Sequence, residues 1–321
     1  YHGPEGIRTI AERIHSIAVF LEKSINKLGY KQVNAQYFDT LRFALPDTIS
    51  AQQIRTIALS KEVNLRYFKN GDVGMSIDET TDIAAVNMLL SIFAIAAGRD
   101  WEKTSDVPMA SSISAEMKRQ SAYLTHEVFN KYHTETEMMR YIKRLDRKDI
   151  SLAHSMISLG SCTMKLNAAA EMLPLSRPEF MNIHPLVPED QAEGYRELIS
   201  NLSEELKTIT GFAGVSLQPN SGAAGEYAGL RVIRAYQESI GQGHRNKILI
   251  PASAHGTNPA SAIQAGFTTV TCACDAQGNV DMDDLRTKAE ENRDDLAALM
   301  ITYPSTHGIF ETEIVEICRI I

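Results

Sequence analysis

The stretch KILIPASAHGTNPASAIQAGFTTVTCAC, residues 247–274, decides the fold class. It opens with an apolar run at 247–251 and passes through a small polar loop into residues suited to a short helix at 261–265. It closes in a β-branched run at 268–274. A buried strand, a helix and a second strand in that order are typical of a parallel sheet covered by helices.

The same alternation extends outward on both sides of this stretch. A short strand is predicted at 215–218 and a helix at 222–240. Downstream, a helix at 282–292 and an apolar strand at 296–303 follow at similar intervals. The pattern from about residue 210 onward therefore predicts the α/β class with a parallel-sheet domain.

The chain before this region has a different pattern, and we divide the sequence into 1–105, 106–165 and 166–321. The first part reads as a small α+β domain, and the second as a linker or arm in which serines suggest a loose joint. The expected elements of the first part are a helix from Ile7 to Ile25, β-forming residues at 33–43, a helix at 48–63, a hairpin at 64–77 turning at Asn70-Gly71-Asp72, and a helix at 80–97 capped within 79–82.

Composition excludes several classes of protein and partner. The 321 residues are 44% hydrophobic and 22% charged, which indicates a globular chain and not a disordered one. Lys and Arg number 32 against 40 Asp and Glu, so the net charge of −8 disfavours nucleic acid as a partner. The longest strongly apolar stretch, 89–97, is about half the length that a bilayer-spanning helix needs. No membrane partner is expected.

The cysteines indicate neither a disulfide framework nor a metal site. There are four, Cys162, Cys272, Cys274 and Cys318, without the clustered Cys and His spacing that zinc requires. This usage fits a reducing cytosol. The strand pair Cys272 and Cys274 is expected to consist of buried, inert thiols.

Two loops after predicted strands carry candidate chemistry. Asn220 to Gly229 is rich in small residues and opens a helix, so its backbone amides and the hydroxyl of Ser221 suit a phosphate. A tight strand-to-helix turn explains the same residues without a ligand. His255, at a strand end, is placed to stack on a flat ligand or to move protons, or it is a surface histidine without a role.

Two further segments complete the candidates. Residues 302–308 form a polar loop after the apolar strand residues 296–301, which places them at the same sheet edge as His255. The cluster GSCTMKLN at 160–167 either lines a site or packs its small polar groups against a neighbouring domain.

Taken together, these segments resemble the P-protein of the glycine cleavage system. The resemblance lies in SLGSCTMKLN at 158–167, QPNSGAAGEYAG at 218–229 and SAHGTNP at 253–259. YHGPEG at 1–6 and TEMMRY at 136–141 resemble it as well, so the resemblance covers nearly the whole chain in order. That family is glycine decarboxylase (glycine dehydrogenase, aminomethyl-transferring), a pyridoxal-phosphate enzyme.

The resemblance implies a fold and an assembly. Each half of the family's chain is similar to the aspartate-aminotransferase fold (fold type I). Residues 1–105 would be the small C-terminal domain of the first half, 106–165 the connection, and 166–321 the truncated, cofactor-binding large domain of the second half. A homodimer or an α2β2-like assembly is implied for the full protein, in the cytoplasm or, in a eukaryote, the mitochondrion.

The resemblance also implies roles for particular residues. Ser221, Gly222 and Ala223 would hold the phosphate of pyridoxal 5'-phosphate, His255 would stack on its ring, and Thr302 would contact the ring's hydroxyl side. Ser161, Cys162, Thr163, Lys165 and Asn167 would line the active site. Glycine would lose carbon dioxide, and its aminomethyl group would pass to the lipoyl group of the H-protein. His255 is also a possible catalytic residue, and no metal is implied.

Two departures from the family pattern matter. Ala224 stands where the family usually has Gln. No His-Lys dipeptide occurs, so the Schiff-base lysine is expected beyond Ile321, and the 321 residues alone are expected to be inactive. The alternatives are a non-enzymatic interaction subunit with the same fold, or another fold type I pyridoxal-phosphate enzyme.

Overall fold

The computed structural model describes residues 1–149 and 168–321. It divides the chain into two compact units, Tyr1–Met156 and Ile157–Ile321. Among the described residues, no helix combines the length and the apolar character that crossing a membrane requires.

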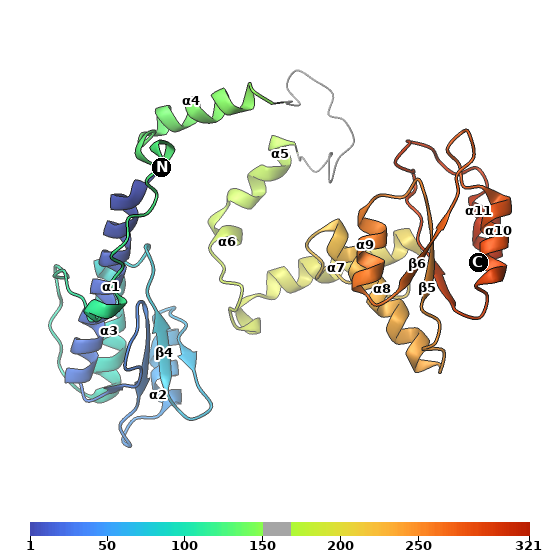
Figure 1. Cartoon of the computed structure of the whole chain (residues 1–321). Coiled ribbons are helices and arrows are strands. Elements are labelled where there is room, and N and C mark those ends of the chain that lie inside the picture. The colour runs from blue at the N-terminus through green and yellow to red at the C-terminus, as the bar shows by residue number, and fades with distance from the viewer. Residues whose placement is uncertain (150–167) are drawn as a thin grey trace. The chain divides into compact units, whose positions relative to one another are not determined.

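The first unit packs helices on an antiparallel sheet (Figure 1). Its described elements are α1 (Gly3–Lys27), β1 (Lys31–Gln32), β2 (Thr40–Ala44), α2 (Ala51–Ser60), β3 (Arg66–Tyr67), β4 (Val73–Ser76), α3 (Ile83–Ala97), the 3-10 helices η1 (Ala115–Met117) and η2 (Glu127–Asn130), and α4 (Glu135–Asp146). The strand order in the described sheet is β1-β2-β4-β3, and every neighbouring pair is antiparallel.

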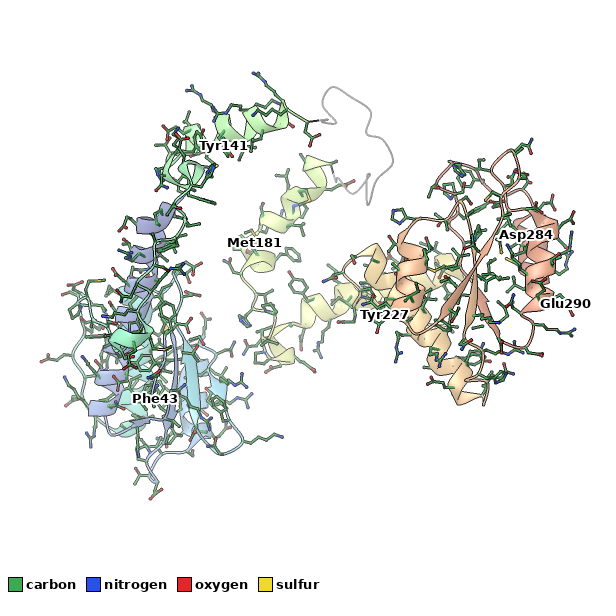
Figure 2. All side chains as sticks on the ribbon, in the orientation of Figure 1. Phe43, Tyr141, Met181, Tyr227, Asp284 and Glu290 are labelled. Atoms are coloured by element: carbon green, nitrogen blue, oxygen red, sulfur yellow. The ribbon has the colours of Figure 1, made fainter. Side chains whose placement is uncertain are left out.

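One apolar core holds this unit together. Ile17, Leu21 and Ile25 recur at helical spacing along α1 and are buried, as the sequence predicts. They share a core cluster with Phe43 of β2 and Phe93 of α3. Figure 2 labels Phe43, which lies inside this unit. Burial of each large apolar side chain contributes about 1.5–3 kcal/mol.

The turn and the cap predicted for this unit are confirmed. β3 and β4 form an antiparallel pair, and the turn between them is closed by Phe68 N donating to the carbonyl of Asp72 at 3.0 Å. Gly71 has φ +93°, a conformation that glycine adopts without a steric penalty. Asp82 is the N-cap of α3, and its carboxylate accepts from Ala85 N at 2.8 Å.

The loose joint expected near the serines is wrong, because this segment is bound to α1. Ser112 N donates to Nε2 of the buried His15 at 3.0 Å, and Nδ1 of His15 lies 2.7 Å from the carbonyl oxygen of Phe38. Ala110 N donates to Ser16 Oγ at 3.0 Å. Two buried polar residues of α1 therefore find their partners about a hundred residues along the chain.

The second unit contains a parallel sheet with helices on both faces (Figure 1). Its described elements are α5 (Ala169–Met172), η3 (Leu173–Ser176), α6 (Pro178–Met181), η4 (Glu189–Gln191), α7 (Glu193–Thr210), α8 (Gly222–Ser239), β5 (Lys247–Pro251), α9 (Thr257–Gln264), β6 (Thr268–Cys272), α10 (Met282–Glu291), β7 (Leu296–Leu299) and α11 (Ile314–Ile320). The described strands run β6-β5-β7, so the apolar run that sets the fold class is central.

Successive side chains of β5 point to opposite faces of the sheet and build two cores. Ile248 and Ile250 belong to one cluster with Leu230 of α8. Leu249 belongs to the other with Leu285 of α10. Because both faces of β5 are covered, its sequence is apolar throughout and not alternating.

Two strand predictions need correction. Residues 215–218 form no strand: they are mostly exposed and carry no regular structure. The strand predicted at 296–303 is β7, which ends at Leu299. After Met300 N donates to Leu249 O at 2.9 Å, the chain leaves the sheet and bonds to the loop after β5.

Candidate functional site

The loops after β5 and β7 meet at the carboxyl edge of the parallel sheet. Thr306 donates to the carbonyl oxygen of Ser253 from its backbone N at 3.2 Å and from Oγ1 at 2.8 Å. His255 N lies 3.4 Å from Thr302 Oγ1, to which it donates. The structure thus brings His255 and Thr302 together at the edge where open α/β sheets bind ligands.

The ring of His255 is held by the start of α9. Thr257 N donates to His255 Nδ1 at 3.1 Å, and Thr257 Oγ1 lies 2.6 Å from the same nitrogen. Asn258 N donates to the carbonyl oxygen of His255 at 2.9 Å. The half-buried His255 is therefore fixed at its backbone and at one ring nitrogen.

Thr302 has one hydrogen-bonding position left for a ligand. Its Oγ1 accepts from His255 N and donates to Oδ1 of the buried Asn258 at 3.2 Å. A hydroxyl supplies one hydrogen and two lone pairs. The unused position is an acceptor, so Thr302 can receive a hydrogen bond without breaking either existing contact.

The small-residue loop forms the N-terminus of α8. Ser221 is the N-cap, and its Oγ accepts from Ala224 N at 3.1 Å. Gly222 and Ala223 follow in the first turn and are exposed, where helical N–H groups have no intrahelical acceptor. A Cβ at Gly222 would meet no described atom within 4 Å. The first turn is thus open for the close approach of an anion.

A contact between helices ties α8 to α9. The buried Ser261 of α9 donates from Oγ to Glu226 Oε2 of α8 at 3.1 Å. Glu226 lies one turn into α8, and Ser261 lies one turn into α9. This bond fixes the two helix beginnings relative to each other.

The loop after β6 is anchored by Asp284 of α10, which Figure 2 labels beside the sheet. Asp284 Oδ2 accepts from Ala273 N at 2.6 Å and from Lys288 Nζ at 2.8 Å. These donors, the backbone N–H first, lower the pKa of Asp284 below its ordinary value. Asp284 is therefore a structural carboxylate that stays ionised at neutral pH.

Cys272 lies at the end of β6 with a fully buried side chain. Burial raises the pKa of its thiol to about 11. The burial expected of Cys272 is confirmed, and its inertness stays a prediction. The burial expected of Cys274 is wrong, because Cys274 is half-buried and lies beyond the strand in an isolated bridge to Val280. Within the described residues, no three His, Cys, Asp or Glu side chains gather as metal ligands would.

The candidate segment at 160–167 lies outside the described residues. Ser161, Cys162, Thr163, Lys165 and Asn167 all fall within 150–167, so their predicted role stays a prediction.

The comparisons with known proteins agree on one family. The family model described as glycine cleavage system P-protein matches residues 1–93. A glycine dehydrogenase (decarboxylating) of Bacteroides fragilis is 86% identical over all 321 residues of this chain, which are 34% of that relative. The chain is therefore similar to the glycine cleavage system P-protein family.

Similarity extends to more distant members of this P-protein family. The relative from Bacteroides thetaiotaomicron is 84% identical over the whole chain, and the one from Flavobacterium johnsoniae is 52% identical. The chain spans about a third of the length of these curated relatives.

Some residues of the site were missed by the sequence reasoning. The motif at 253–259 pointed to His255, but not to Thr257, Asn258 or Thr306 as its supports. A hydroxyl two residues after a loop histidine is a usable signal, because this spacing lets a side chain and its own amide reach one ring nitrogen.

Proposed function

We propose that this chain forms part of a glycine dehydrogenase (decarboxylating) that uses pyridoxal 5'-phosphate. The observation that carries the proposal is the joining of the loops after β5 and β7, which places His255 beside Thr302. The relatives named glycine dehydrogenase (decarboxylating) support the same activity. The aspartate-aminotransferase-like (fold type I) assignment belongs to this proposal and is supported by the parallel sheet with its helix-covered faces.

The described residues fit this cofactor. The open first turn of α8 suits its phosphate, with N–H groups from Gly222 and Ala223 and a hydroxyl hydrogen from Ser221. The positive end of the helix dipole adds to the attraction. His255 would lie on the ring and Thr302 would accept a hydrogen bond at its edge. The N–H of Ala224 donates to Ser221 Oγ, and its side chain has no polar group that could contact the phosphate.

These positions separate what the cofactor would do from what the residues of the chain would do. When bound, pyridoxal phosphate supplies an electron sink for the carbon that loses its carboxylate. The chain's own residues bind and orient: the α8 turn anchors the phosphate, and the bonded loops fix His255. Glycine would be the substrate, and the lipoyl group of the H-protein would accept the aminomethyl group. In this proposal residues 1–105 are a small domain, 106–165 a connection and 166–321 part of the cofactor-binding domain. The full protein would form a homodimer or an α2β2-like assembly.

Binding of the cofactor to the 321-residue chain tests the proposal. Gly222→Asp places a carboxylate in open space at the phosphate position, so it should weaken pyridoxal phosphate binding at least tenfold without unfolding α8. Val232→Asp, on the exposed side of the same helix, is the matched control and should bind normally. Absorbance titration gives both affinities. The phosphate site would be overturned if the two variants bound pyridoxal phosphate equally well, or if inorganic phosphate did not compete with it.

The catalytic expectation has a separate test. Because the family's lysine is expected outside these residues, the 321-residue chain should show no exchange of carbon dioxide with glycine. Exchange by this chain, together with an absorbance band that borohydride removes, would contradict that expectation.

A further inference from the structure

Thr257 controls the imidazole of His255 through two contacts from one residue. Its backbone N lies 3.1 Å and its Oγ1 lies 2.6 Å from His255 Nδ1. Thr257 is the first residue of α9, so the position of its amide is set by the helix. The contact between ring and threonine is therefore part of the fold.

The amide and the hydroxyl of Thr257 together set where the ring proton lies. An amide N–H can only donate, so it makes this bond when Nδ1 presents its lone pair and carries no hydrogen. The hydroxyl of Thr257 then also donates to Nδ1. In the neutral ring the proton is left on Nε2.

We infer that Thr257 is a positioning residue that holds His255 in the single neutral form with its proton on Nε2. The inference rests on the proposed function for the ligand that the ring meets. With Nδ1 occupied, Nε2–H is the polar group that the ring has left. His255 can thus donate a hydrogen bond to the ligand or lie on its face, but it does not act as a base while this arrangement holds.

The surrounding bonds leave the ring direction to Thr257. His255 N donates to Thr302 Oγ1 and His255 O accepts from Asn258 N, so the backbone is held on both sides. These two bonds fix the Cα position and not the tautomer. Removal of the Thr257 hydroxyl leaves only the longer amide contact, so a larger fraction of the rings should carry the proton on Nδ1, without movement of the loop.

Nitrogen NMR of the 321-residue chain, labelled with 15N-histidine and without cofactor, tests the inference. The wild-type His255 should show a lone-pair Nδ1 and a protonated Nε2, assigned by the loss of its signals in His255→Gln. Thr257→Val should bring the two nitrogen shifts closer together, and Thr257→Ser should restore their separation. Thr287→Val is the matched control, since the Thr287 hydroxyl donates to the Asp283 carbonyl within α10, and it should leave the separation unchanged.

A second readout separates this inference from the proposed function. Pyridoxal phosphate affinity should fall about fivefold in Thr257→Val, the effect of one lost hydrogen bond, and recover in Thr257→Ser. A protonated Nδ1 in the wild type, or an unchanged separation in Thr257→Val, would overturn the role of Thr257 even if the cofactor binds. If the cofactor fails to bind while the nitrogen shifts behave as stated, the proposed function fails and the tautomer assignment stands.

Discussion

Alkylation of Cys272 should be at least a hundredfold slower than that of an ordinary thiol. Its side chain is fully buried in the cluster with Leu249 and Leu285. Burial raises the pKa of the thiol from 9.0 to about 11. At pH 8 this leaves about one thiolate in a thousand, against about one in ten at pKa 9, and the thiolate is the reactive form.

The assay is pulsed alkylation of the folded chain with iodoacetamide at pH 8, followed by peptide mass spectrometry. Cys318 is exposed and serves as the internal reference. The two rates should converge once denaturant unfolds the chain. Modification of Cys272 in the folded chain as fast as that of Cys318 would refute both its burial and the raised pKa.

The same shift makes stability depend on pH. Between pH 9 and about 11 the folded state keeps the Cys272 proton while the unfolded state loses it, so the free energy of unfolding falls as pH rises. Two pKa units correspond to about 2.7 kcal/mol, fully present below pH 9 and lost by about pH 11. Cys272→Ala should lack this part of the slope in urea unfolding. A variant with the wild-type slope would contradict the assignment.

Two further substitutions test the cores of the two units by urea unfolding. Leu285→Ala removes a fully buried side chain and should lower the free energy of unfolding by about 2–5 kcal/mol, whereas Val315→Ala, 69% exposed, should change it by less than about 0.5 kcal/mol. His15→Leu leaves the Phe38 carbonyl and the Ser112 amide without their partner and should cost about 2–4 kcal/mol; a cost below about 0.5 kcal/mol would argue against those bonds.

Local chemistry in the sequence was enough to predict several elements correctly. The apolar run at 247–251 has charged and turn residues around it and becomes the central strand β5. Asp82 stands before an apolar helical run and caps α3. In each case the decisive interactions lie within a few residues, so pattern and propensity carry the information.

Elements that depend on distant partners were beyond this reasoning. Residues 215–218 have strand-forming composition, but a strand needs a neighbour to satisfy its backbone groups. After β7 the chain bonds through Thr306 to Ser253, a partner 53 residues away that no local pattern indicates. The sequence pattern correctly predicted that His255 follows a strand. Its contact with Thr302, 47 residues away, depends on how the two loops fold and could not be predicted.

The attachment of Ser112 to His15 also bears on how the chain is made. These two residues are 97 positions apart. At a synthesis rate of about 5–20 residues per second, a ribosome that has just added His15 reaches Ser112 only about 5–20 s later. During that interval α1 can form, but Nε2 of His15 lacks its native donor and its surroundings stay open to water. The rate of translation, and not the rate of helix formation, therefore sets when the segment around Ser112 can pack against α1.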